Sequence, residues 1–240
     1  MLYAVKKPIK LLETVFDILY LVTLLILACV LLFQPHSAGS MRWELGCLAL
    51  VLAIGDTCHL STRIRAMWWN TTSDHAAALG LGKMASSVTM TLFYLGLWHI
   101  GTVFYEVHSI PLNTLVVFLA VARILLCLLP QNKWISSEKQ PDTNLLTQSK
   151  IHSWTQSKIQ IWRNLPFFFL GLAVMMIFLT GSLMKPYGPS FLWAAVLISF
   201  AFYLPVVLFA GKYPKLGMLM LPKSCVYIVI ILMGFSLPGG

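Results

Sequence analysis

The sequence predicts an all-α, polytopic membrane protein with seven transmembrane helices. Of its 240 residues, 58% are hydrophobic and only 10% are charged, and the mean hydropathy is +0.81. An ordinary soluble domain carries about 25% charge, and a disordered chain is polar and highly charged, so this composition excludes both classes. Seven long apolar stretches and the positions of the prolines support the same prediction. We therefore treat residues 1–240 as a single integral membrane domain.

A helix needs about 20 apolar residues to cross the bilayer core, and seven stretches reach this length. The expected spans are residues 10–33, 45–64, 79–100, 110–130, 165–184, 190–211 and 216–237. Prolines lie at or near their ends, where a missing N–H does least harm: Pro35, Pro111, Pro130, Pro166, Pro186, Pro189 and Pro214. The first stretch is too long for the apolar region of a signal peptide, so we expect it to stay as a helix.

The distribution of Lys and Arg predicts the orientation. Of 17 basic residues, 12 lie in the N-terminal segment and in the second, fourth and sixth loops, and two, Arg42 and Lys185, lie on the other side. Cytoplasmic loops carry the excess of Lys and Arg, so the N-terminus is expected in the cytoplasm and the C-terminus outside. The net charge of +9 is explained by this orientation and by contact with anionic lipid. No nucleic-acid partner is expected.

The one long loop, residues 131–164, is expected to lie in the cytoplasm and to contain an amphipathic helix. Ile151, Trp154, Ile159, Ile161 and Trp162 fall on one side of a helix at 100° per residue. Such a helix would lie on the membrane surface with its lysines toward lipid phosphates. A flexible linker is the alternative.

Four ionisable residues inside the expected spans share one depth. Asp17, Asp56, Arg123 and Lys223 each lie seven or eight residues from a cytoplasmic boundary, which corresponds to ~10–12 Å. Ionisable side chains in a membrane are costly and are functional candidates by default. Because two are acidic and two basic, we expect a neutral polar layer. Arg123 can alternatively extend its charge to the helix end.

Other polar side chains extend this layer along the same helical faces. They are Lys10, Thr14, His59, Arg63, Lys83, Ser87, Thr91, Tyr94, Trp98, Ser199, Tyr203 and Tyr227. If these faces converge, they form a polar cavity that opens to the cytoplasm and has an aromatic floor. The hydroxyl groups have a second interpretation, since such groups often only hydrogen-bond across a helix bundle.

The histidines and cysteines do not predict a metal site. His59 has no second His or Cys at ligand spacing, so we interpret it as a partner of Asp56 or as a cavity wall. No G-x-S-x-G, H-E-x-x-H or glycine-rich phosphate loop occurs in the sequence. We expect neither a metal nor a cofactor, so any chemistry must use carboxylates, hydroxyls and bases within the membrane.

A series of short motifs resembles the YhhN-like lysoplasmalogenases. The matching residues are Lys7-Pro8, Gly55-Asp56-Thr57-Cys58-His59-Leu60 with Arg63, Phe93-Tyr94, and Ser199 with Tyr203. That family has eight helices and cleaves the vinyl-ether bond of lysoplasmalogens to release a fatty aldehyde. The resemblance covers most of the chain if the family's first helix is absent here. It implies a lysophospholipid-like membrane substrate, and the expected location is the bacterial plasma membrane.

The sequence departs from the family at three places. Phe200 follows Ser199 where the family has an aspartate, Ser86-Ser87 stands where a histidine is common, and Pro222-Lys223-Ser224 differs from the usual last helix. Vinyl-ether hydrolysis needs a proton donor to carbon and benefits from a second carboxylate. The resemblance implies that Asp56 donates the proton, while Asp17 can replace the missing aspartate.

The leading hypothesis is therefore a membrane-embedded lipid hydrolase. Its expected catalytic residues are Asp56, Asp17 and His59. Its expected substrate-binding residues are Lys223, Arg63, Ser87, Thr91, Tyr94, Ser199, Tyr203, Tyr227 and Arg123, with Lys223 and Arg63 holding the lipid phosphate. The alternative is a non-catalytic protein that binds or transports a lipid or small molecule in the same cavity. A third hypothesis is a structural partner that docks another helix on its glycine-containing faces.

Overall fold

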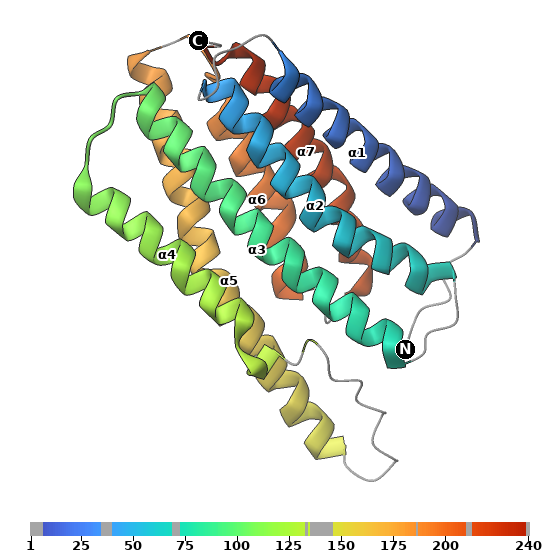
Figure 1. The fold of residues 1–240 in the computed structure, drawn as a ribbon. Coiled ribbons are helices and arrows are strands. Elements are labelled where there is room, and N and C mark those ends of the chain that lie inside the picture. The colour runs from blue at the N-terminus through green and yellow to red at the C-terminus, as the bar shows by residue number, and fades with distance from the viewer. Residues whose placement is uncertain are drawn as a thin grey trace.

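The computed structural model describes residues 7–34, 40–68, 73–132, 134, 146–185, 187–209 and 213–238. Within them, seven α-helices form the fold (Figure 1) and no strand is present. The helices are α1 (Lys7–Phe33), α2 (Met41–Trp68), α3 (Ser73–Phe104), α4 (Ile110–Leu128), α5 (Leu146–Met184), α6 (Leu192–Phe209) and α7 (Met220–Met233). Short 3₁₀ turns follow α4 (Pro130–Asn132), precede α7 (Pro214–Leu219) and follow α7 (Gly234–Ser236).

Six of the helices close into a ring. Each packs against the next in the order α1, α2, α3, α5, α6 and α7, and α7 packs back against α1. Helix α4 lies at the edge of this ring, against α3 and α5 (Figure 1). The helix order in space therefore differs from the order in the sequence at α4.

All seven helices are long and apolar enough to cross a membrane, which confirms the seven expected stretches. The stretches that meet this criterion are 10–33, 41–68, 77–104, 110–128, 159–184, 192–209 and 216–236. The second, third and fifth are longer than expected, because the helices continue where the sequence turns polar. Charged side chains are tolerated in these terminal turns because long side chains reach the polar boundary.

The expectation that only four ionisable residues lie within the spans is wrong. Arg63 and Lys83, near the ends of the expected spans 45–64 and 79–100, and Arg163, just before the expected span 165–184, lie inside three of the seven helices. Glu13 lies inside the first and was overlooked. The polar layer is therefore larger than the sequence indicated.

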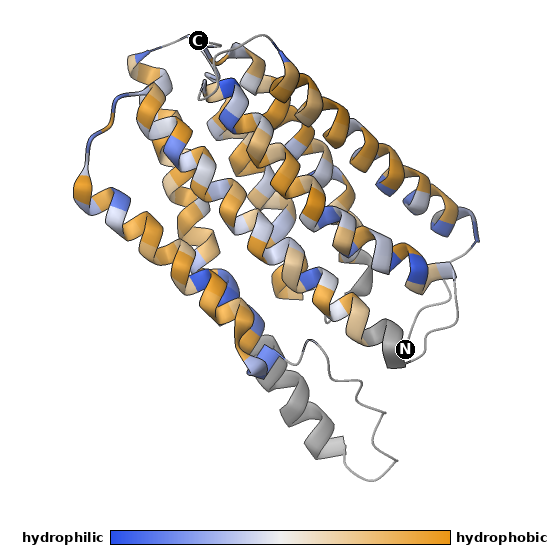
Figure 2. Cartoon of the chain, viewed as in Figure 1, coloured by the Kyte–Doolittle hydropathy of each residue, from blue (hydrophilic) through white to orange (hydrophobic). Residues whose placement is uncertain are grey.

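The outer surface of the bundle is apolar along much of its length. Leu12, Leu19 and Ile26 on α1 are all more than half exposed, and other helices show similar side chains. Figure 2 shows this apolar surface on α1, with hydrophilic residues concentrated toward the end where α1 begins. An exposed apolar surface of this extent is what a lipid environment requires of a helix bundle.

Inside the bundle, one half is tightly filled. Near the end of α1, Leu24, Leu31, Leu45, Leu52 and Leu97 are completely or almost completely buried. An aromatic cluster lies next to them.

Tyr94 makes edge-to-face contacts at the centre of this aromatic cluster. Its ring centroid lies 5.1 Å from that of Phe167, 5.6 Å from that of Phe200 and 6.5 Å from that of Tyr227. Aromatic rings prefer this edge-to-face geometry, so the cluster forms a solid layer across the bundle.

The last part of the expected long loop is helical and belongs to α5. Helix α5 begins at Leu146 and continues to Met184, so the last part of residues 131–164 is the start of the fifth helix. The side chains of Ile151 and Trp154, and residues 135–145, lie outside what the structure describes. The position of this segment on a membrane surface stays a prediction.

The described part of the chain begins and ends at opposite ends of the bundle. Helix α1 starts at the end where α2 finishes, and α7 and its 3₁₀ turn finish at the other end (Figure 1). An odd number of antiparallel spans has this consequence. The assignment of either end to the cytoplasm stays a prediction from the Lys and Arg count.

Candidate functional site

A cavity of about 270 Å³ lies in the half of the bundle where α1 begins. All seven helices contribute side chains to it. The contributing residues come from the first half of α1, α3, α5 and α7 and from the second half of α2, α4 and α6. Because consecutive helices run in opposite directions, these segments meet at one end of the bundle. The aromatic cluster around Tyr94 lies about one helical turn deeper.

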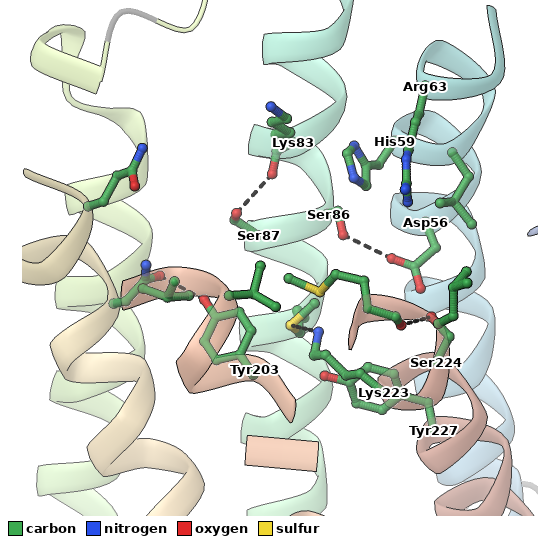
Figure 3. Close-up of a pocket in the computed structure, with 18 of the residues that line it drawn as sticks. Asp56, His59, Arg63, Lys83, Ser86, Ser87, Tyr203, Lys223, Ser224 and Tyr227 are labelled. Carbon is green, nitrogen blue, oxygen red and sulfur yellow. Dashed lines mark hydrogen bonds between the residues drawn. The ribbon is translucent and has the colours of Figure 1, made fainter. Parts of the chain in front are cut away.

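Asp56, on α2, lies in this cavity with both carboxylate oxygens engaged. The Tyr20 hydroxyl donates to Oδ2 at 2.7 Å, and the Ser86 hydroxyl donates to Oδ1 at 2.9 Å. Asp56 is only 8% exposed, and Figure 3 shows its carboxylate facing Ser86 across the gap between α2 and α3. The two hydrogen bonds fix the position of the carboxylate and partly replace the water that burial removes.

Asp17, on α1, is the second acidic side chain that lines the cavity. It is 2% exposed, and its Oδ2 atom has no hydrogen-bond partner among the described residues. Asp17 and Tyr20 are three residues apart, so they lie on the same face of α1. Asp17 and Asp56 thus reach one cavity from two different helices.

Lys223, in the first turn of α7, brings a buried ammonium group to the centre of the cavity. Its Nζ atom lies 4.9 Å from the ring centroids of both Tyr203 and Tyr227, and 3.5 Å from the sulfur of Met90 (Figure 3). The side chain is 5% exposed. Among the described residues, no carboxylate oxygen lies within 4.0 Å of it. The aromatic faces provide weak cation–π attraction but no neutralising charge.

Two arginines from α4 and α5 form the opposite side of the cavity. Arg123 is 2% exposed, its Nη1 atom donates to the backbone carbonyl of Arg163, and its guanidinium lies 5.4 Å from the Phe167 ring centroid. Arg163 lies 4.4 Å from the Trp134 ring centroid and donates to Asn132 Oδ1 at 3.0 Å. The Nε atoms of both arginines are buried without a hydrogen-bond partner in the described part of the chain.

The segment after α4 is held in place as part of the cavity wall. Asn132 Nδ2 donates to the carbonyls of Leu126, Cys127 and Leu129, and Trp134 Nε1 donates to the Cys127 carbonyl at 2.8 Å. These bonds satisfy the free carbonyl groups at the end of α4. The Trp134 carbonyl packs where a side chain on Gly80 would lie, so only glycine fits at that position of α3.

Arg63 was expected to hold a lipid phosphate, and the structure gives it a different partner. Its guanidinium forms an ion pair with the Glu13 carboxylate of α1. Arg63 therefore lines the cavity with its charge already balanced. Sequence reasoning missed Glu13 because the residue lies close to the start of the first apolar stretch, although its spacing of four residues from Asp17 places both on one face.

His59, Lys83 and Ser87 line the remaining wall. Ser87 donates to the Lys83 carbonyl at 2.8 Å, and Lys83 is exposed at the edge of the cavity. His59 Nδ1 has no hydrogen-bond partner among the described residues. In the part of the chain that the structure describes, no three His, Cys, Asp or Glu side chains gather in a way that can hold a metal ion.

Three residues that were expected to bind substrate do not line the cavity. Thr91 donates to the Ser87 carbonyl at 2.8 Å, and Tyr94 and Ser199 share a long contact of 3.5 Å between their hydroxyl oxygens. All three are buried in the packed layer beneath the cavity. For these hydroxyls, the structure matches the second interpretation, hydrogen bonding within the bundle. The other nine predicted residues line the cavity: Asp17, Asp56, His59, Arg63, Ser87, Arg123, Tyr203, Lys223 and Tyr227.

The structure also adds residues that sequence reasoning missed. Tyr20 and Ser86 hold Asp56, Asn164 accepts a 2.8 Å hydrogen bond from the Tyr203 hydroxyl, and Arg163 joins Arg123. Arg163 and Asn164 directly precede the expected fifth span and were counted as loop. A hydropathy window that began one helical turn before residue 165 would have included both residues.

The cavity carries an excess of positive charge, in contrast to the neutral layer expected from four residues. Its acidic side chains are Asp17 and Asp56. Its cationic side chains are Arg63, Lys83, Arg123, Arg163 and Lys223. With Arg63 paired to Glu13, four cations remain against two carboxyl groups. Such a cavity favours an anionic ligand.

No protein-family model, curated protein or solved structure matches the chain. Function must therefore be inferred from the chemistry of this cavity. It combines two carboxyl groups that can transfer protons, a set of anion-binding cations and an apolar surrounding. This combination suits acid–base chemistry on an anionic amphiphile.

Proposed function

We propose that the protein is a membrane-embedded hydrolase of the lysoplasmalogenase type, which cleaves the vinyl-ether bond of a single-chain phospholipid. The observation that supports this function best is the presence of Asp17 and Asp56 in one cavity. The YhhN-like family has a second aspartate, which this sequence lacks at the corresponding position. Asp17 supplies a carboxyl group from a different helix.

The reaction adds water across the vinyl ether. A proton is transferred to the C=C carbon that is not attached to oxygen, and this transfer leaves an oxocarbenium ion. Water then attacks the carbon next to oxygen and loses a proton, and the resulting hemiacetal breaks to give a fatty aldehyde and a glycerol hydroxyl. One carboxyl group is needed to donate the proton, and a nearby carboxylate stabilises the cation and accepts the proton from water.

The hydrogen bonds distinguish the two acids. Both oxygens of Asp56 accept hydrogen bonds, from Tyr20 and Ser86, so this carboxylate is held in place as the cation stabiliser. Asp17 has an oxygen with no partner among the described residues, and that oxygen is free to carry and release a proton. The geometry thus favours the reverse of the roles that the sequence suggested.

The cavity suits a lipid that enters from within the bilayer. The helices are apolar on their outer surface, and the cavity lies at the end that the Lys and Arg count assigns to the cytoplasm. In the proposed arrangement, the head group lies at this depth and the chain extends between helices into the bilayer. The expected setting is the bacterial plasma membrane.

An activity assay on the purified protein tests this function. The protein in detergent is given a 1-alkenyl lysophospholipid, and the released aldehyde is measured with a coupled alcohol dehydrogenase. We expect turnover in the wild type and a loss of about 100-fold or more in both Asp56→Asn and Asp17→Asn, because general acid–base groups contribute about 10²–10⁴-fold. Glu44→Gln, an acid at the opposite end of α2, is the matched control and should keep full activity. Absence of turnover, or unchanged turnover in Asp56→Asn, would contradict the proposal.

A non-catalytic lipid-binding protein is the second candidate. The observation that favours it is the excess of cations around Lys223, which supports binding but is not needed for proton transfer. This candidate predicts that an alkenyl lysophospholipid copurifies intact and remains intact for hours. Detection of free aldehyde in the same sample would exclude it.

A further inference from the structure

The cavity holds more unpaired positive charge than a membrane protein would bury without a ligand. Arg123 and Lys223 are nearly completely buried, and no ion pair involves either of them, Lys83 or Arg163 among the described residues. Buried charges are tolerated when they are paired, and an uncompensated one is strongly destabilising. With Arg163, which is half-buried, and Lys83, which is exposed at the edge of the cavity, the excess over two ionised carboxyl groups is two charges.

We propose that the cavity binds a phosphate monoester, the dianionic head group of a single-chain lipid, in preference to a phosphodiester. This inference rests on the proposed function in taking a single-chain lipid as the occupant, and it narrows the head group. A phosphate monoester carries about −1.5 to −2 charges near neutral pH and has three strong acceptor oxygens. A phosphodiester carries one charge and would leave part of the excess unbalanced.

The donors surround the space from several helices. Arg123 comes from α4, Arg163 from α5 and Lys223 from α7. The Tyr203 hydroxyl of α6 lies beside them and already donates its hydrogen to Asn164 Oδ1. Guanidinium groups match the geometry of phosphate oxygens, and lysine adds a point charge. Three unsubstituted oxygens of a monoester can therefore meet donors on different sides, whereas the second ester of a phosphodiester leaves only two such oxygens.

The two carboxyl groups fix the orientation of such a ligand. Figure 3 shows Asp56 on α2 at one side, Tyr203 at the other side and Lys223 between them. A phosphate is repelled by carboxylates, so it lies toward Arg123, Arg163 and Tyr203. The three-carbon glycerol then spans toward the acids and brings the ether bond to them.

The volume of the cavity agrees with a small head group. At about 270 Å³ it lies just below the range of about 300–1,000 Å³ that is common for ligand sites. A glycerol phosphate fits such a space, and the hydrocarbon chain must leave it. Free phosphate or glycerol 3-phosphate has the same dianionic chemistry and is the other possible source.

A binding experiment with matched ligands separates these possibilities. The full-length protein in detergent is titrated with 1-acyl-glycerol 3-phosphate, with its phosphate methyl ester, and with glycerol 3-phosphate, and binding is measured by calorimetry. We expect the monoester lipid to bind at least about tenfold more tightly than the methyl ester, because one additional charge interacts with desolvated cations. Weak binding of glycerol 3-phosphate indicates a lipid source, and binding as tight as that of the lipid indicates a soluble phosphate.

Variants connect this preference to the named residues. Arg123→Gln and Lys223→Gln should each reduce the preference for the monoester to about threefold or less. Arg42→Gln is the matched control, since Arg42 bonds the Leu237 carbonyl at the far end of the bundle. If Arg123→Gln does not fold, Arg123→Lys keeps the charge but loses the paired donors, and it should retain binding with a weaker preference.

The outcomes separate this inference from the proposed function, because acyl lipids contain no vinyl ether. Equal binding of monoester and methyl ester, or a preference that survives in both glutamine variants, overturns the phosphate-monoester assignment even if alkenyl lipids are hydrolysed. A strong preference for the monoester, with no aldehyde released from alkenyl lipids, supports the phosphate-monoester assignment and excludes the hydrolase function.

Discussion

At the end where α1 finishes, aliphatic and aromatic side chains fill the space between the helices. At the end where α1 begins, the same helices surround a cavity of about 270 Å³ lined by charged groups. The filled half contains Leu24, Leu52 and Phe178, each completely buried. The cavity half contains Asp17 and Lys223, which are buried without an ion-pair partner among the described residues. This difference indicates that close packing stabilises one half of the fold, whereas the buried charges of the other half lower its stability, as is typical of functional sites.

The largest effect on this comparison should come from the filled half. Phe178 of α5 is 0% exposed and packs against Tyr105, with ring centroids 5.8 Å apart. Phe178→Ala should lower the free energy of unfolding by about 3–5 kcal/mol, because a large cavity replaces many packing contacts. Thermal unfolding in detergent measures this loss. Phe169→Ala, a 46% exposed position on the same helix, is the control and should change the stability little.

An intermediate effect of opposite sign is expected in the cavity half. Lys223→Met removes a buried, unpaired charge and keeps a side chain of similar length. It should raise the stability of the lipid-free protein by about 1–2 kcal/mol, because replacing buried charges with apolar groups is often stabilising. The melting temperature in detergent without added lipid is the readout. A lower melting temperature than the wild type would mean that Lys223 is already balanced, and the comparison between the halves would fail.

The smallest effect is expected at the surface ion pair outside the helical spans. Lys185 Nζ lies 2.7 Å from Glu106 Oε1. The hydrogen bond and charge of Lys185 lower the pKa of Glu106 from its ordinary 4.5, and the same hydrogen bond, which Lys185 donates to Glu106, raises the pKa of Lys185 from its ordinary 10.5.

The contribution of this pair to stability should depend on pH in a defined window. It is fully present between about pH 4.5 and 10.5, and it decreases as the pH falls through the lowered pKa of Glu106 or rises through the raised pKa of Lys185. Because Glu106 is exposed and Lys185 is only partly buried, the effect is small. Melting curves of wild type and Glu106→Gln should differ slightly at pH 7, and the difference should shrink as the pH falls below 4.5. A difference that grows at pH 3 would contradict the assignment.

The sequence predicted much of the fold because the relevant signals are local. Twenty apolar residues form a span whatever lies beside them, and the seven spans were found within a few residues of their ends. An error occurred where a helix continues through a polar turn, as at Arg163. Hydropathy marks where the apolar sequence ends and not where the helix ends.

The cavity was only partly predictable, for a different reason. Spacing of three or four residues shows which side chains share a helix face, but it does not show how far each helix is rotated toward its neighbours. Thr91 and Ser87 share a face of α3, yet Ser87 lines the cavity and Thr91 is covered by the packed layer beneath it. The Glu13–Arg63 pair depends on α1 lying beside α2 at one particular height. Such long-range contacts are set by the packing of the whole bundle.

The measurement that tests the account most directly is the accessibility and charge of the cavity. In a background with all five cysteines replaced, Ser87→Cys is exposed to two thiol reagents of equal size, an anionic and a cationic methanethiosulfonate. Thr91→Cys, one turn deeper on α3, is the matched control. We expect Ser87→Cys to react with both reagents and at least about tenfold faster with the anionic one, because unpaired cations surround it. We expect Thr91→Cys to be unreactive. Faster reaction of Ser87→Cys with the cationic reagent, or no reaction at all, would contradict a cationic cavity that is open to ligand.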